Sequence, residues 1–160
     1  MNKRKIIFMI LTVCWMIGIF TFSSRTAELS SQDSNHVGIV IGEMFVPDFE
    51  NWSKAKQQAF AEKVDHPIRK TAHAAEYAVL GAMLMGVFAG EQSKRWSVLK
   101  SWILGTGYAA TDEFHQLFVA GRSGQMSDVM LDSFGVFAGV LIACFFLVLQ
   151  SKYRKGENSC

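Results

Sequence analysis

The strongest constraint on the fold is an uncharged apolar run near the start of the chain, at residues 6–22. A helix needs about 20 residues, within a range of roughly 17 to 25, to cross the hydrocarbon of a bilayer. A second run of this kind covers residues 129–149 and is interrupted only by Asp132. Both segments are therefore predicted to be transmembrane helices.

Two further apolar segments carry ionisable residues, and they are predicted to span the membrane if these residues face other helices. Residues 70–90 contain His73 and Glu76. Residues 96–117 carry Lys100 near their start and their other ionisable side chains close to the end of the segment. Composition agrees, because 50% of the 160 residues are hydrophobic and only 19% are charged. The sequence predicts one all-α domain over residues 1–160, a four-helix transmembrane bundle.

The basic residues indicate the orientation of this bundle. The basic residues form three clusters. One precedes the first span, one lies around the connection between the second and third spans, and one follows the fourth span. In that order they are Lys3, Arg4 and Lys5; Lys94, Arg95 and Lys100; and Lys152, Arg154 and Lys155. Four crossings place the clusters on one side, and the positive-inside rule makes that side the cytoplasm. Both termini are therefore predicted to be cytoplasmic (N-in/C-in). The net charge of +2 gives no indication of a nucleic-acid partner.

The N-terminus and the cysteines are compatible with this topology. The first run also resembles a signal sequence, but no A-x-A cleavage pattern follows it. Cys14 and Cys144 fall in predicted spans and Cys160 at the predicted cytoplasmic end, so no disulfide framework is expected.

The extracytoplasmic segment between the first two spans, residues 23–68, is predicted to contain two short helices. The first carries an apolar face around Val37 and Val40, with Asp33 or Ser34 as its N-cap and Pro47 ending it. A second helix is predicted over residues 51–66, before a new helix whose first turn contains Pro67. Either these helices lie on the outer membrane surface or they pack on the bundle.

Every span contributes polar residues at the same outer level under this topology. Helical spacing places them on shared faces: Arg69, His73, Glu76 and Tyr77; Tyr108, Asp112, His115 and Gln116; and Asp128, Asp132, Gly135 and Gly139. Glu113 points away from the second face, toward Arg122. The two glycines form a G-x-x-x-G surface that lets another helix approach, which turns Asp132 inward. The residues form either an outward-facing polar pocket or a structural salt-bridge network.

Three stretches carry a family resemblance. "FTFSSR", "RKTAHAAEYAVLG" and "YAATDEFHQLFVAGRSGQMSDVMLDSFGVFAG" are similar to the VanZ-like family of small bacterial membrane proteins, over roughly residues 10–149. Ala120 stands where the family commonly has a proline. The resemblance implies a multi-pass protein of the bacterial cytoplasmic membrane. The family is named for a protein linked to teicoplanin resistance, and the resemblance implies no particular reaction.

One hypothesis is a binding protein for an anionic membrane lipid or lipid-linked cell-envelope precursor, with consequences for glycopeptide susceptibility. Basic and polar side chains would bind its phosphate: Arg25, Arg69, Lys70, Tyr77, Gln116 and Arg122. The oligomeric state stays open.

A second hypothesis is an acid–base hydrolase or transferase acting on a lipid phosphate. The candidate catalytic residues are His73, Glu76, Asp112, Glu113, His115, Asp128 and Asp132. A divalent metal is compatible with these residue types, but "DEFH" differs from the H-E-x-x-H zinc pattern, and no metal ligand is assigned. Proton or ion transport is a third hypothesis, disfavoured because the inner halves of the spans carry few polar residues.

Overall fold

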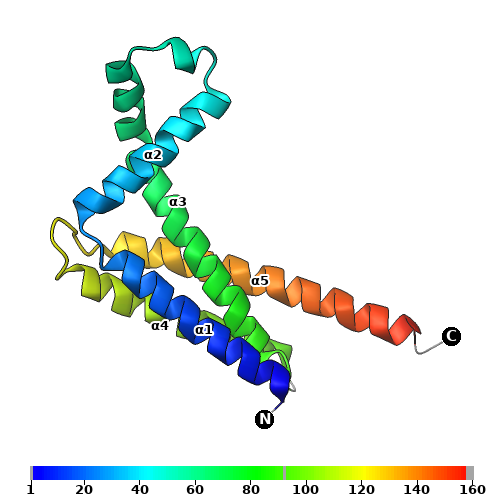
Figure 1. Ribbon diagram of the computed structural model, residues 1–160. Coiled ribbons are helices and arrows are strands. Elements are labelled where there is room, and N and C mark those ends of the chain that lie inside the picture. Colours follow the sequence, from blue (N-terminus) through cyan, green and yellow to red (C-terminus); the bar gives the residue numbers. More distant parts are fainter. Residues whose placement is uncertain (1, 92, 158–160) are drawn as a thin grey trace.

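The computed structural model describes residues 2–91 and 93–157, and Cys160 lies outside them. The elements are α1 (Lys3–Ser23), α2 (Ala27–Phe45), the single-turn helix η1 (Phe49–Asn51), α3 (Lys54–Phe88), α4 (Lys94–Gln116) and α5 (Met126–Glu157) (Figure 1). No strand occurs in this described part of the chain, so the all-α prediction is confirmed.

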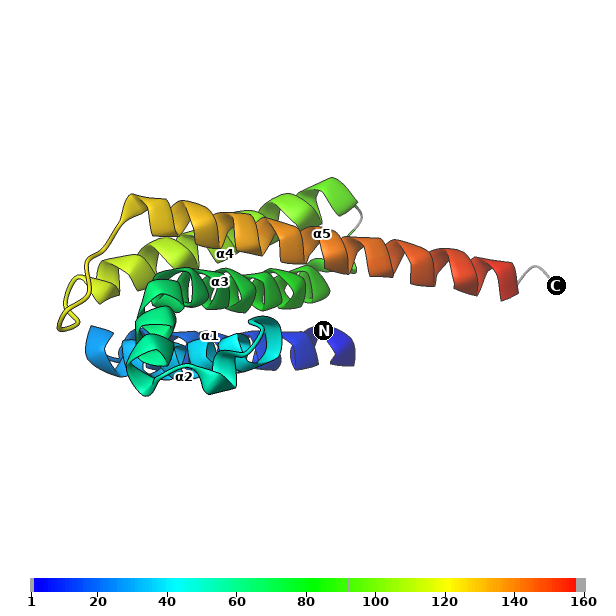
Figure 2. The same cartoon turned by 90° about the horizontal axis from the view of Figure 1, so that it is seen from above.

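Within residues 2–91 and 93–157, three helices are long and apolar enough to cross a membrane: α1, α3 and the Met126–Tyr153 part of α5. The fourth predicted span corresponds to α4, which is not among them. In Figures 1 and 2, α4 nevertheless runs beside the other long helices. The N-terminus and the α3–α4 connection lie at one end, and the α4–α5 loop (residues 117–125) lies at the other with the end of α1.

Helices α3 and α5 pack with their backbones close together. A Cβ on Gly139 would lie 2.6 Å from the carbonyl carbon of Ala78, and one on Gly135 would lie 3.1 Å from that of Ala74. Only a residue without a side chain allows this approach. The predicted G-x-x-x-G packing face is confirmed, and Asp132 on the same face is only 3% exposed.

The core lies where α1, α3, α4 and α5 meet. Its buried apolar side chains are Ile19, Tyr77, Leu80, Leu84, Met85, Ala109, Val136 and Val140. Two hydrogen bonds connect α1 to its neighbours: Trp15 Nε1 donates to the Glu76 carbonyl (2.9 Å), and the Tyr108 hydroxyl donates to the Met16 carbonyl (2.7 Å). Large apolar side chains on the outer helix faces are exposed, as expected for helices in lipid.

Helix α2 begins earlier than the sequence predicted. Its N-cap is Thr26, whose hydroxyl accepts from the Leu29 N–H (3.4 Å). The predicted caps are wrong because both side chains make tertiary contacts: Asp33 pairs with Arg25, and Ser34 donates to Asp65. The predicted end of the helix before Pro47 is confirmed.

The predicted apolar face of α2 is not the buried one. Small residues spaced by four, Ser34, Gly38 and Gly42, are buried, whereas Val37 and Val40 are 45% and 40% exposed. A Cβ on Gly38 would lie 3.1 Å from the Ala61 Cα atom, so small residues allow α2 to approach α3 closely.

The helix break predicted before Pro67 is also wrong, because α3 continues through this residue. Proline removes one intrahelical hydrogen bond, to the carbonyl four residues earlier. Here that carbonyl belongs to Lys63, and both residues are exposed, so water can bind it. Figures 1 and 2 show α3 changing direction between the part that packs on α2 and the part inside the bundle, as expected for a proline kink.

Candidate functional site

A polar cavity of about 190 Å³ lies between α3, α5, the end of α4 and the α4–α5 loop. Its lining residues are His66, Arg69, Lys70, His73, Glu113, Gln116, Gly121, Arg122, Ser123, Gln125, Asp128, Leu131 and Asp132. Eight of them were predicted as site residues from the sequence, from three separate segments of the chain. The structure therefore brings most of the predicted constellation together.

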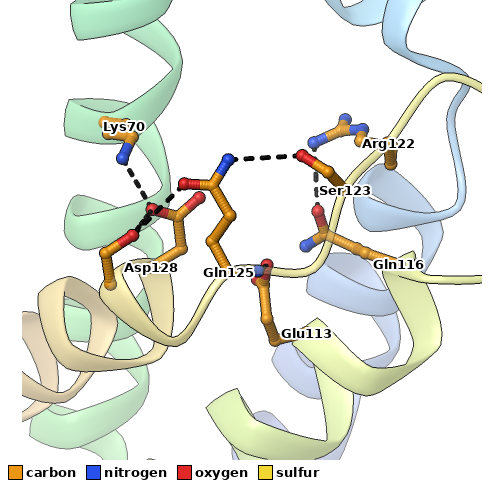
Figure 3. Close-up of polar contacts among 8 residues, drawn as sticks. Lys70, Glu113, Gln116, Arg122, Ser123, Gln125 and Asp128 are labelled. Carbon is orange, nitrogen blue, oxygen red and sulfur yellow. Dashed lines mark hydrogen bonds and ion pairs between the residues drawn. The ribbon is translucent and has the colours of Figure 1, made fainter.

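The α3 wall of the cavity contributes two cations that have carboxylate partners. Arg69 Nη2 lies 2.7 Å from Asp65 Oδ2, one turn earlier in α3. Lys70 Nζ lies 2.6 Å from Asp128 Oδ1, which connects α3 to the first turn of α5 (Figure 3). Both partners of this second pair are about 30% exposed or less. The Nε atom of Arg69 is buried and has no hydrogen-bond partner in the part of the chain that the structure describes.

Arg122 in the α4–α5 loop is the third cation of the cavity. Its Nη1 donates to Gln116 Oε1 (3.3 Å), as Figure 3 shows, and its Nε donates to the Arg25 carbonyl (3.3 Å). It makes no ion pair with any residue that the structure describes. Burial, followed by the nearby charge of Arg69, lowers the pKa of Arg122, although an arginine remains protonated in proteins.

The loop conformation around Arg122 depends on its neighbours. Gly121 has a φ of 74°, in the left-handed region that glycine adopts without a steric penalty. Glu113 Oε1 accepts from the Gln125 N–H (2.6 Å), which holds the loop against the end of α4. The sequence predicted Glu113 to point toward Arg122, and it instead binds this loop backbone, although both line the cavity.

Among the residues that the structure describes, three side chains of the predicted site have a buried oxygen without a hydrogen-bond partner: Asp132 Oδ1, which belongs to a cavity-lining residue, and Asp112 Oδ1 and the Tyr77 hydroxyl, which belong to residues outside the lining. The three side chains are at most 3% exposed. Asp112 uses its other oxygen to accept from Ser23 Oγ (2.7 Å) and Gln116 Nε2 (3.4 Å). Buried polar atoms in folded proteins are nearly always satisfied, so Asp132 Oδ1, which belongs to a cavity-lining residue, indicates a place for water or a ligand.

His73 and Glu76 continue the polar face of α3. His73 lines the cavity, and its Nδ1 is buried without a hydrogen-bond partner, 3.9 Å from Glu76 Oε2. Glu76 lines a neighbouring groove together with Arg25, which is paired with Asp33.

Three predicted site residues, Tyr77, Asp112 and His115, line neither of these spaces. Tyr77 belongs to the buried core, and Asp112 and His115 contact the end of α1. Nε2 of His115 lies 3.2 Å from Ser24 Oγ, and its ring packs on Phe20 with 4.4 Å between centroids. Because these partners lie at the end of α1, His115 belongs to the α1–α4 contact.

Sequence reasoning missed five lining residues, of which Gly121 and Leu131 are not polar and His66, Ser123 and Gln125 are. Ser123 and Gln125 lie between Arg122 and Asp128, so their position in that loop was the available signal. His66 lies three residues before Arg69 on the same helical face, but the predicted break at Pro67 separated it from the site.

No group of three or more His, Cys, Asp or Glu side chains suited to a metal ion occurs in residues 2–91 and 93–157. The divalent metal considered from the sequence therefore gains no support from the side-chain arrangement. The chemistry available in the cavity is that of guanidinium, ammonium, imidazole and carboxyl groups.

The apolar helices and the charged cavity at one end of the helix bundle define the class, a helical membrane protein with a polar site. The family model described as VanZ/LLP1 matches residues 8–147, and the chain belongs to this family. The resemblance seen in the sequence is confirmed. No curated protein and no solved structure matches the chain.

Proposed function

We propose that this protein binds the phosphate group of an anionic cell-envelope lipid or lipid-linked precursor in the polar cavity. The observation that carries the proposal is Arg122, a half-buried guanidinium without a carboxylate partner among the described residues, beside the unpartnered Nε of Arg69. Guanidinium groups bind phosphate oxygens through paired N–H donors. A bound phosphate would therefore supply the acceptors that the protein leaves out.

A purely structural salt-bridge network explains only part of this arrangement. The Lys70–Asp128 pair joins two helices, and the Arg69–Asp65 pair lies within one helix. Arg122 instead depends on two neutral acceptors, which leave most of its charge available. Asp112, Glu113 and Glu76 act on Arg122 only from a distance, and a half-buried cation without a direct ion pair costs free energy that a bound phosphate would lower.

The proposed setting is the bacterial cytoplasmic membrane, with four crossings and both termini in the cytoplasm. Support comes from the three basic clusters, which belong to the N-terminus, the α3–α4 connection and the end of α5. The cavity adjoins the α4–α5 loop at the opposite end, so this orientation makes it face outward. Binding of a wall precursor there would alter its access to glycopeptides such as teicoplanin.

Catalysis on the bound lipid is a second candidate function. It is favoured by the unpartnered oxygens of Asp112 and Asp132 and by the unpartnered His73 Nδ1. In a hydrolysis, water would add to phosphorus, the bond from phosphorus to the lipid oxygen would break, and that oxygen would receive a proton. His73 and Asp132 are the cavity-lining groups suited to moving that proton.

The test compares purified wild type with Arg122→Gln and with Arg95→Gln, a matched control at an exposed arginine outside the cavity. Binding of dioctanoyl phosphatidic acid is measured by calorimetry in detergent. A charged hydrogen bond contributes roughly 1.5–3 kcal/mol, so Arg122→Gln is expected to weaken binding about tenfold or more. Equal affinities of the two variants would contradict the proposal.

The same samples test the catalytic candidate. Release of inorganic phosphate by wild type, lost in Asp132→Asn while the lipid still binds, would support hydrolysis. If wild type binds the lipid and releases no inorganic phosphate, hydrolysis is contradicted and the binding function stands.

A further inference from the structure

A second space, a groove of about 210 Å³, lies beside the polar cavity between the end of α1, α2 and α3. The cavity and the groove share three lining side chains: Arg69, His73 and Arg122. A molecule whose charged end lies against the two guanidinium groups can therefore extend into the groove.

The groove has a different chemistry from the cavity. Phe22, Val37, Ile68 and Ala72 give it an apolar wall built from three helices. Its charged residues near α2, Arg25 and Asp33, neutralise each other in an ion pair. Ser30, Ser34 and the Glu76 carboxyl also line the groove, and its cations without an ion-pair partner in the groove, Arg69 and Arg122, lie where it meets the cavity.

The position of Phe22 shows what the groove opens onto. Phe22 lies in the last turn of α1, which is apolar enough to cross a membrane, and its side chain is 57% exposed. Val37 on the opposite side of the groove, from α2, is 45% exposed. The apolar wall is therefore continuous with the outer surface that α1 presents to lipid.

We propose that this groove is an acyl-chain subsite, and that the ligand of the polar cavity is a chain-bearing phospholipid that enters sideways from the bilayer. Its phosphate lies against Arg69 and Arg122, and its chain passes Ala72 and Phe22 toward the hydrocarbon. This inference rests on the proposed function of the cavity. The inference adds that the acyl chain of the lipid contributes to recognition, so free phosphate is not the preferred ligand.

Three probes separate the headgroup from the chain: inorganic phosphate, glycerol 3-phosphate and dioctanoyl phosphatidic acid. Each methylene removed from water increases affinity roughly fourfold, so wild type is expected to bind the lipid at least tenfold more tightly than glycerol 3-phosphate. Calorimetry on the full chain in one detergent measures all three.

Two tryptophan variants test the groove itself. Ala72→Trp fills the groove, and Ala75→Trp places the same side chain at an exposed position of α3 that lines neither the groove nor the cavity. The gain in binding free energy from glycerol 3-phosphate to dioctanoyl phosphatidic acid measures the contribution of the acyl chains. Ala72→Trp is expected to lose at least two thirds of this gain, while its affinity for glycerol 3-phosphate stays unchanged. Ala75→Trp is expected to behave as wild type, which also controls for partition of the lipid into micelles.

The outcomes distinguish this inference from the proposed function. If Ala72→Trp and Ala75→Trp bind the lipid equally, or if wild type binds glycerol 3-phosphate as tightly as the lipid, the groove is not a chain subsite, although the phosphate site stands. If wild type binds none of the three probes, the proposed function fails and the chain subsite fails with it.

Discussion

Replacing Gly139 by alanine tests the packing on which the candidate site is built. A Cβ at Gly139 would lie 2.6 Å from the carbonyl carbon and 2.9 Å from the Cα of Ala78, which are backbone atoms that cannot rotate away. Extra atoms in a well-packed contact cost typically about 1–3 kcal/mol. Alanine also favours the helical state over glycine by about 1 kcal/mol, which partly offsets this cost.

Gly107→Ala in α4 is the matched control, because no heavy atom lies within 4 Å of a Cβ built there. The helix-propensity gain is common to both variants and cancels in their difference. Gly139→Ala is therefore expected to be less stable than Gly107→Ala by about 1–3 kcal/mol, the packing cost alone.

The assay is unfolding of the purified protein in mixed detergent and dodecyl sulfate micelles, followed by circular dichroism. Each variant gives a free energy of unfolding from its transition. A Gly139→Ala protein as stable as Gly107→Ala would show that α3 and α5 do not approach as described, and the positions of Asp128 and Asp132 relative to α3 would lose their basis.

Two further predictions concern the ion pair and the orientation. A double-mutant cycle on Lys70→Ala and Asp128→Ala should give a coupling energy of about 1–2 kcal/mol, because the pair is partly exposed and lies between the surface and buried limits; additive effects within error would show that the pair does not hold α3 to α5. A cysteine at Ser123, in a variant without the three native cysteines, should react with an impermeant maleimide added to intact cells, whereas one at Lys94 should react only after lysis; the reverse pattern would invert the proposed topology.

Helix positions and the convergence of polar residues were predictable from the sequence. Apolar runs gave the helices, and the i, i+4 spacing of Asp128, Asp132, Gly135 and Gly139 predicted one face of α5 for both charge and close packing. The structure confirms that face, with the glycines against α3 and Asp132 buried. Such features depend on local periodicity, which one sequence contains in full.

Features that depend on tertiary contacts were not predictable in this way. Which face of α2 is buried depends on how closely α3 approaches. Small residues such as Gly38 allow the close approach, so they are buried in place of the larger apolar residues. Continuation of α3 through Pro67 takes place where Lys63 and Pro67 are both exposed, which the sequence does not reveal. His115 shares a helical face with Asp112, but it contacts Ser24 and Phe20 at the end of α1 and does not line the cavity.

The packing of α3 on α5 and the charge arrangement of the cavity are parts of one contact. Gly135 and Gly139 bring the two backbones together, and one and two turns away on the same face lie Asp132 and Asp128. The close approach allows Lys70 to reach Asp128, which satisfies the charge of both side chains. Lys70 and Asp128 thus pair with each other across the α3–α5 contact. Arg122 lies in the α4–α5 loop and takes no part in this contact. Arg122 joins the loop to the Arg25 carbonyl and to Gln116 through neutral acceptors, and a bound phosphate would provide the anionic partner that its guanidinium lacks among the described residues.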